Sequence, residues 1–347
     1  MSIEFTLPPD LEAHDPPESR GTPRDGVRML VSQGTTGDIS HHRFGELSGL
    51  LRPGDLIVVN TSGTLPAEVV AVPDPGGQDT RRLAVHFSTA WPDGGWLIEL
   101  RSITGPATVP YPGGAPGDAI ALPGGARLTL GERVTGRLWR ARLSTAVVPY
   151  LLRHGVPIRY SYVQQEWPLD AYQTVFATRP GSAEMPSASR PFSPEVVTRL
   201  VAGGITFAPL TLDTGVSSLE GDEEPYPEPF DVPPATARLV NLTRRTGGRV
   251  IAAGTTVVRA LETAARAEPA GDGMVAASAG WTSHIVTPDV PLLAVDGLLT
   301  GLHEPRSSHL RMLAAFAGPD LLGRCYQAAI DARYLWHEFG DVHLLLP

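Results

Sequence analysis

The sequence predicts an α/β protein, in which a mixed-sheet main domain carries an inserted small β-barrel domain. Buried strand-like runs alternate with helical patterns before residue 67 and after residue 147, which is typical of α/β domains. Residues 67–147 instead hold short strand-like pieces between turns rich in Gly, Pro and Asp, which favours a barrel or sandwich. We therefore expect a discontinuous main domain over 1–66 and 148–347, with the barrel over 67–147.

The segments around this insert predict the elements of the main domain. Residues 3–28, rich in Pro and acids, are expected to form an extended arm on the surface. Apolar periodicity, caps and glycine stops predict the remaining elements in this order: strand 27–31, helix 42–51, a strand ending at Asn60, strand 172–176, helix 193–202, strand 205–212, helix 234–245, strands within 281–294, helices 308–317 and 321–336, and strand 339–346. The acidic, Pro-rich stretch 219–230 is expected to be a solvated loop or, alternatively, a mobile flap.

The central strand–turn–helix unit lies at residues 249–267. Val250 to Ala253 are uncharged, as in a strand buried on both faces, and a helix is expected over 257–267. Between them, Gly254, Thr255 and Thr256 offer N–H and hydroxyl groups where α/β sheets bind anions and polar ligands.

A purely structural alternative exists for this unit. Thr256 would then only cap the helix, and Glu262 would only pair with Arg266 four residues later.

Composition excludes several classes of site. The chain has no lysine, which rules out a Schiff-base lysine and a phosphate-loop lysine. Cys325 is the only cysteine, so an intrachain disulfide and a Cys-cluster zinc site are excluded, and the ten histidines lack metal-ligand spacing. The net charge of −9 gives no support to broad phosphate binding. With no long apolar run, we expect no membrane contact, a cytoplasmic location and a monomer.

Several segments together resemble the S-adenosylmethionine:tRNA ribosyltransferase-isomerases of queuosine biosynthesis, in the family's order and over nearly the whole chain. They are Pro53–Asn60 with Leu65-Pro-Ala67; Tyr172–Phe176 with Pro180-Gly-Ser182, Pro186 and Phe192; Gly248–Glu262; Asp296–Thr300 with His303, Pro305 and Ser307; Ala314–Gly318; and Phe339-Gly-Asp341.

This resemblance implies an α/β domain with an inserted barrel, and an unusual reaction. Such enzymes move the ribosyl part of S-adenosylmethionine onto the aminomethyl group of a 7-deazaguanine in tRNA. The ribosyl ring becomes an epoxycyclopentanediol, while adenine and methionine leave. S-adenosylmethionine is thus a co-substrate that donates ribosyl, and no metal is implied.

The resemblance also implies roles for particular residues. The candidate catalytic residues are His303, Glu262 and Asp341. The candidate substrate-binding residues are Tyr172, Gln173, Thr174, Pro186, Ser187, Gly254, Thr255, Thr256, Arg259, Asp296 and Ser307. Arg259 is expected to bind a carboxylate such as that of the methionine moiety, and His303 to transfer protons. Glu262 would orient ribose hydroxyls or only fix Arg259, and His303 has the alternative of a structural histidine beside a Ser307 helix cap.

The chain also departs from the family's usual motifs. Gly63 and Glu68 stand where arginines are usual, and Pro191 and Asp213 stand where histidines are usual. Fewer cations and more carboxylates weaken phosphate contacts, which makes tRNA a weakened expectation as partner. Two alternatives therefore stay open: a divergent enzyme with a small-molecule acceptor, and a non-catalytic S-adenosylmethionine-binding protein of the same fold.

Overall fold

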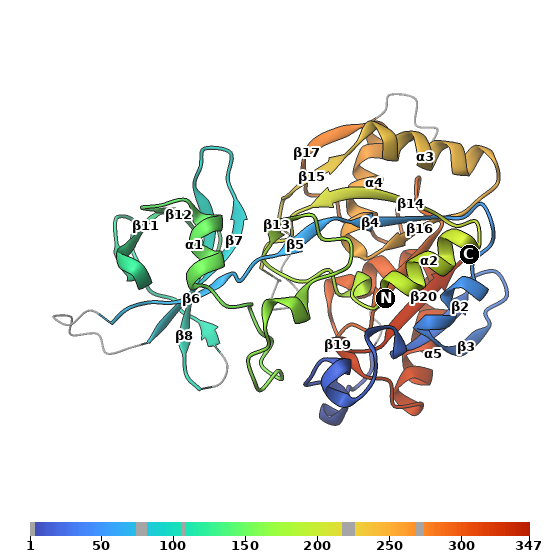
Figure 1. The fold of residues 1–347 in the computed structure, drawn as a ribbon, viewed down its shortest axis with the longest axis horizontal. Helices are drawn as coiled ribbons and strands as arrows, with labels where there is room; N and C mark the ends of the chain where they lie inside the picture. Colours follow the sequence, from blue (N-terminus) through green and yellow to red (C-terminus); the bar gives the residue numbers. More distant parts are fainter. Residues whose placement is uncertain (1–3, 74–81, 106–107, 217–225, 268–273) are drawn as a thin grey trace.

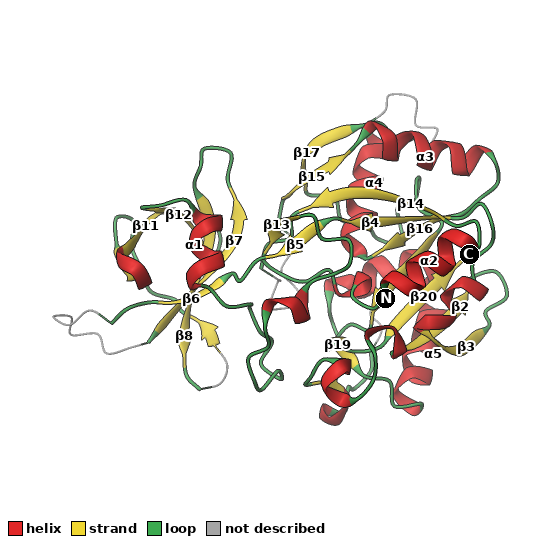
Figure 2. Ribbon diagram, viewed as in Figure 1, coloured by secondary structure: helices red, strands yellow, loops and turns green. Residues whose placement is uncertain are grey.

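The computed structural model describes residues 4–73, 82–105, 108–216, 226–267 and 274–347. Two large sheets lie side by side, one mixed and covered by helices, the other antiparallel (Figures 1 and 2). This confirms the predicted mixed α/β class. Residues 217–225, which include most of the expected acidic loop, lie outside the described ranges.

Within the part of the chain that the structure describes, the mixed sheet has nine strands, and its central strands β14, β4, β16 and β18 are parallel. Their carboxyl ends therefore share one edge of the sheet. The strands in spatial order are β17 (Ser278–Thr282), β15 (Glu228–Val232), β14 (Thr206–Leu212), β4 (Leu56–Asn60), β16 (Val250–Ala253), β18 (Gly297–Gly301), β20 (Val342–Leu346), β2 (Arg28–Gln33) and β3 (Ile39–Arg43).

Helices cover both faces of this sheet, and its inner strands β4, β16, β18 and β20 are buried at every position. In β4, Leu56 and Val58 pack on one side, against α3 (Pro234–Arg245), α4 (Thr255–Arg266) and α5 (Ser308–Asp331). Ile57 and Val59 point to the other side, toward α2 (Pro194–Ala202) and the 3-10 helix η4 (Phe44–Gly49). The alternation follows the two-residue period of a strand.

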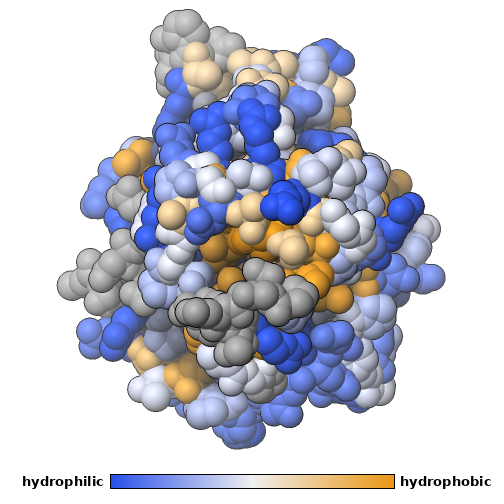
Figure 3. All heavy atoms as spheres, turned by 90° about the vertical axis from the view of Figure 1, so that its left-hand side faces the viewer, coloured by the Kyte–Doolittle hydropathy of each residue, from blue (hydrophilic) through white to orange (hydrophobic). Residues whose placement is uncertain are grey.

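The second sheet is wholly antiparallel and has its own apolar core, which includes Phe87, Ile98 and Trp139. Its strands are β6 (Glu68–Val70), β7 (Leu83–Ala90), β8 (Trp96–Ile103), β9 (Thr108–Pro110), β10 (Ala119–Leu122), β11 (Ala126–Arg133) and β12 (Leu138–Leu143). Val72 N donates to Ala121 O at 2.9 Å, which brings the two outer strands together and nearly closes the sheet. Apolar side chains surround a hollow on this side of the molecule (Figure 3).

Short elements connect the two sheets and tie down the N-terminal arm. They are η1 (Pro9–Leu11), β1 (Glu12–Ala13), η2 (Pro17–Arg20), η3 (Arg24–Gly26), β5 (Ser62–Thr64), η5 (Pro123–Gly125), α1 (Val147–His154), η6 (Leu169–Tyr172), β13 (Arg179–Ser182), η7 (Ser187–Ser189) and β19 (Trp336–Glu338). β5 pairs with β13, and β1 pairs with β19. The Trp91 and Trp281 rings, one from each sheet region, lie 5.1 Å apart.

Several predicted elements need correction. The predicted strand 172–176 is wrong: η6 ends at Tyr172, and the following residues bond through side chains rather than a strand ladder. Of the strands expected within 281–294, only the last two residues of β17 form. The helix expected at 42–51 is the shorter η4. The two helices expected after 307 are confirmed as the two parts of α5, which is broken at Gly318, where φ is 71° and ψ is 158°, but the second part ends at Asp331 rather than at 336.

Two further features concern solvent and membrane exposure. Within the described ranges, no helix is both long and apolar enough to cross a membrane. Cys325 of α5 is fully buried, and burial raises the pKa of its thiol to about 11.

Candidate active site

The candidate site lies on the edge where β4, β16 and β18 end. Gly254 follows β16 with φ of 103°, a conformation that favours glycine. A Cβ atom at Gly254 would lie 3.7 Å from Ala188 Cβ, so this turn and η7 approach closely. Thr255 and Thr256 open α4 beside them and are half-buried. Ligands of open α/β sheets bind at this kind of edge.

Asn60, at the end of β4, holds this edge together and was missed as a site residue. Its buried Oδ1 accepts from the backbone N–H groups of Ser62 and Leu212, at 3.0 and 3.1 Å. Its Nδ2 donates to Leu212 O at 2.7 Å and to Thr256 Oγ1 at 3.4 Å. Gly254 is the N-cap of α4 and makes no side-chain cap bond, so the alternative that Thr256 caps this helix is wrong.

Arg259 is already engaged by protein atoms. Its guanidinium pairs with Glu228 and donates to the backbone oxygens of Tyr226, Thr282 and His284, each at 3.2 Å. The side chain is only 9% exposed. These contacts fasten α4 to β15 and β17, so they fit a positioning role better than the expected contact with a substrate carboxylate.

Glu262 is fully buried on α4 and faces the segment before β18. Its carboxylate accepts from the backbone N–H groups of Leu293, Ala294 and Val295 at 2.9–3.2 Å. It also pairs with Arg266, so the i,i+4 contact of the structural alternative is confirmed. Both oxygens are thus occupied by protein donors, which does not fit the expected direct role in catalysis.

Two aspartates bond the backbone N–H groups of neighbouring segments. Asp341 accepts from the backbone N–H groups of Arg28 and Leu335, at 2.7 and 2.8 Å, and pairs with the Arg28 guanidinium. Asp296 accepts from Val250 N at 2.8 Å and precedes β18. Asp296 therefore lies at the opposite end of the strands from Gly254, about 13 Å away along a five-residue strand. Its expected substrate contact stays a prediction.

His303 belongs to a cluster of three histidine rings beyond the end of β18. Its ring stacks on His309 at 4.4 Å between centroids, and lies 5.5 Å from His337. Its Nε2 shares a hydrogen bond of 2.9 Å with Thr300 Oγ1. Burial, followed by the charges that the other histidines would carry, holds the pKa of His303 well below its usual value of 6.5. His303 is thus a neutral imidazole at neutral pH.

Ser187 and Pro186 bring the η7 loop to this histidine cluster. Pro186 O accepts from Ser189 N at 2.9 Å, which closes the short helical turn. Ser187 Oγ lies 3.3 Å from His337 Nε2 and shares a hydrogen bond with it. A Cβ atom at Gly301 would lie 3.3 Å from His337 Cδ2, so the ring packs closely against the strand end and would have to shift by a few tenths of an ångström for a larger residue.

The segment Tyr172-Gln173-Thr174 packs behind η7. The Gln173 amide bonds both backbone groups of Thr64, accepting from N at 3.0 Å and donating to O at 2.8 Å. Thr174 Oγ1 accepts from Phe176 N at 3.3 Å. Gln173 and Thr174 therefore hold the chain in place, whereas Tyr172 points its buried ring at Phe339, 5.1 Å away.

Ser307 caps α5, as the structural alternative for this region expected. Its Oγ accepts from His309 N at 3.3 Å and lies 3.0 Å from His309 Nδ1. Through this cap Ser307 orients the ring that stacks on His303.

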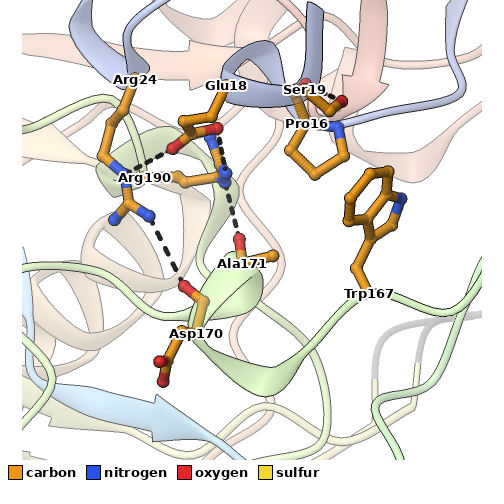
Figure 4. A pocket seen from close by; sticks show the side chains of 8 residues that line it. All are labelled: Pro16, Glu18, Ser19, Arg24, Trp167, Asp170, Ala171 and Arg190. Carbon is orange, nitrogen blue, oxygen red and sulfur yellow. Dashed lines mark hydrogen bonds and ion pairs between the residues drawn. The ribbon is translucent and has the colours of Figure 1, made fainter.

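A separate cavity of about 230 Å³ lies under the N-terminal arm (Figure 4). Arg190 crosses it, donating to Ala171 O and Glu18, each at 2.8 Å. Arg24 also bonds Glu18, at 3.1 Å. The cavity is lined by Pro16, Glu18, Ser19, Arg24, Trp167, Asp170, Ala171 and Arg190. Ala171, which lines this cavity, directly precedes Tyr172.

Acids that replace usual family cations have local partners. Asp213 accepts from Ser62 Oγ at 2.7 Å and pairs with Arg179 at 3.3 Å. Glu68 lies 2.7 Å from His86 Nε2. These carboxylates therefore add less repulsion of anions than their number indicates.

Sequence reasoning missed most of the groups around the histidine cluster, including His309, His337, Glu338, Tyr160 and Tyr162. One signal was available, because Trp336-His337-Glu338 directly precedes the Phe339-Gly-Asp341 motif. Among the described residues, no group of three or more His, Cys, Asp or Glu side chains is placed to hold a metal ion.

Comparison with known proteins identifies the family of this chain. The profile of the queuosine biosynthesis protein family matches residues 1–345. The S-adenosylmethionine:tRNA ribosyltransferase-isomerase of Geobacter sulfurreducens is 33% identical, covering 98% of this chain and 97% of that protein. The Thermus thermophilus enzyme of the same name is 34% identical over 99% of both. A crystal structure of the S-adenosylmethionine tRNA ribosyltransferase from Thermotoga maritima superposes with a TM-score of 0.56, at 26% identity and 99% coverage of both chains. These matches span both partners almost end to end, and the chain belongs to the S-adenosylmethionine:tRNA ribosyltransferase-isomerase family.

Proposed function

We propose that this protein transfers the ribosyl moiety of S-adenosylmethionine to a 7-aminomethyl-7-deazaguanine in tRNA and isomerises it, releasing adenine and methionine. The observation that carries this proposal is the end-to-end match to enzymes of that name. The Gly254 turn, the Ser187 loop and the His303–His337 cluster meet at one strand edge, where a polar substrate fits.

A hollow that contains two arginines supports tRNA as the acceptor. It measures about 330 Å³ and is lined by Arg28, His41, His42, Arg43, Glu46, Ala332 and Tyr334. Val342 pairs with both Gly301 and Met29, and Met29 pairs with His42. The hollow is thus three strand spacings, about 15 Å, from the end of β18. Cations at this distance are placed to contact phosphates beside a base held at the edge.

The test measures adenine and methionine release from S-adenosylmethionine by the purified protein. It is run alone, with tRNA carrying the aminomethyl base, and with the free base. Release only with tRNA, together with tRNA binding that weakens steeply with salt, is the expected result. Release with the free base would instead support a small-molecule acceptor, and binding without release would support a non-catalytic protein.

We further propose that residues 67–147 form an inserted barrel domain and that 1–66 with 148–347 form the main domain. The separate apolar core of the antiparallel sheet supports this division. A monomer, a cytoplasmic location and a reaction without metal complete the proposal. Sedimentation measures the first, and turnover after treatment with a chelator measures the last.

A further inference from the structure

Three polar side-chain atoms lie buried beside the histidine cluster without a hydrogen-bond partner among the described residues. They are Glu338 Oε2, Tyr172 Oη and Tyr162 Oη. Glu338 is 6% exposed and Tyr172 is 1% exposed. Buried polar atoms almost always have a partner, because leaving one without a partner is costly. Three of them in one region indicate a group that the protein binds there.

The three side chains surround one place. Glu338 is the last residue of β19 and pairs with Ala13 of β1. The residue after Ala13 is His14, whose Nδ1 lies 2.7 Å from the backbone oxygen of Tyr162. The Tyr172 ring packs on Phe339, directly after Glu338. Tyr172 and Phe339 belong to one buried apolar cluster, and Tyr162 packs against it. The charge of Glu338 adds to the burial that raises the pKa of both Tyr162 and Tyr172.

Aromatic rings connect this place to the catalytic edge. Tyr160 stacks on Tyr162 at 5.6 Å and meets His337 edge-on at 5.4 Å. Its hydroxyl donates to Glu184 at 3.2 Å. His337 in turn contacts Ser187 and lies beside His303. Only the Tyr160 ring therefore separates Tyr162 from His337, and a group bound against Glu338 would lie close to the proposed reaction site.

The charges around Glu338 are predominantly negative. Burial, followed by the charge of Glu184 and, more weakly, that of Glu304, raises the pKa of the Glu338 carboxyl. Arg190 acts in the opposite direction, but its guanidinium is paired with Glu18. A positively charged ligand would therefore be favoured here by both the carboxylate and the aromatic faces.

We propose that Glu338, Tyr162 and Tyr172 form a subsite for an organic cation of the substrates, either a sulfonium or a primary ammonium. The inference rests on the proposed function, whose donor carries a sulfonium and whose acceptor carries an aminomethyl group. A sulfonium has no N–H to donate, so it would be held by charge and ring faces alone. An ammonium would also donate to Glu338 Oε2 and to the tyrosine hydroxyls.

The test is calorimetric binding to the wild-type protein and to Glu338→Gln. S-adenosylmethionine is compared with S-adenosylhomocysteine, which lacks the sulfonium charge, and the free aminomethyl base with its 7-methyl analogue. We expect Glu338→Gln to weaken one charged ligand at least about tenfold and its neutral analogue less than twofold. The ligand that responds identifies the source of the cation. Glu195→Gln, an exposed carboxyl on α2, is the matched control.

Tyr172→Phe keeps the ring and removes only the hydroxyl, which guards against misfolding of the glutamine variant. If the cation is an ammonium, this variant should weaken the aminomethyl base several-fold; if a sulfonium, it should leave S-adenosylmethionine unchanged. Equal binding of each charged and neutral pair to wild type and Glu338→Gln would overturn the subsite while turnover with tRNA still stands. Failure of the wild type to bind either cation, with no turnover, would refute the function and the subsite together.

Discussion

Replacement of Glu262 separates a structural from a catalytic role for this buried carboxylate. Glu262→Ala leaves the N–H groups of Leu293, Ala294 and Val295 without their acceptor. At about 1–3 kcal/mol for each buried donor, the loss of stability is roughly 3–9 kcal/mol, a large part of the 5–15 kcal/mol that typically holds a domain folded. Glu262→Gln keeps one oxygen for these donors and should lose about 2–4 kcal/mol.

The assay pairs urea unfolding with turnover of the folded protein. We expect both variants to unfold at a lower urea concentration than the wild type. The urea midpoint should be lowest for Glu262→Ala and intermediate for Glu262→Gln. Glu262→Gln should keep kcat within about threefold of wild type, since its oxygens serve the backbone rather than a substrate. A glutamine variant that unfolds at the wild-type urea concentration but has lost turnover would refute this reasoning and restore Glu262 as a catalytic residue.

Three further predictions concern charge and position. Arg259→Ala should destabilise by about 3–5 kcal/mol, because Glu228 would be left buried without its partner; raised KM for S-adenosylmethionine at unchanged stability would show a carboxylate contact instead. Asp296→Ala should leave the KM for S-adenosylmethionine unchanged in steady-state assays, because Asp296 lies at the end of β18 away from Gly254. A tenfold rise in this KM would contradict that reasoning. His343, buried with a pKa of about 3, binds a proton in the unfolded chain below pH 6.5 but not in the folded one. Its stabilising contribution is complete above that pH, and about 2 kcal/mol is lost between pH 6.5 and 5. His343→Gln should make the urea midpoint depend less steeply on pH over this range, while His303 and His309, whose pKa values burial also lowers, keep part of the slope. An unchanged slope would count against this prediction.

The sequence predicts the main sheet well where local pattern and tertiary role agree. Residues 250–253 form the expected strand, since their uncharged run favours a buried strand. Residues 234–245 form the expected helix, which ends before the glycines that were expected to stop it. The prediction of a strand at 172–176 was wrong, although β-branched and aromatic residues such as those of this segment are typical of strands. The Gln173 amide instead bonds the Thr64 backbone, a contact between residues 109 apart, which no local pattern reveals.

The site was predictable only in part for the same reason. The strand–turn–helix pattern identified the Gly254 turn, and the resemblance identified Ser187 and His303; the structure brings these residues to one end of the sheet. It also selected Asp296, which precedes β18, whereas His303 follows β18 and therefore lies at the opposite end of that strand. His337 and Glu338 reach the site by strand pairing of β19 with the N-terminal arm, a long-range event without a short sequence signature.

The buried thiol of Cys325, in a chain without lysine, has a practical consequence for spectroscopy. Amine-reactive reagents have no side-chain target, and a thiol with a pKa of about 11 and no exposure resists maleimides in the folded protein. One cysteine introduced on the antiparallel sheet and another on α3 would therefore carry a donor–acceptor dye pair without background. With these two labels, the distance between the two sheets could be measured in single molecules as substrates bind.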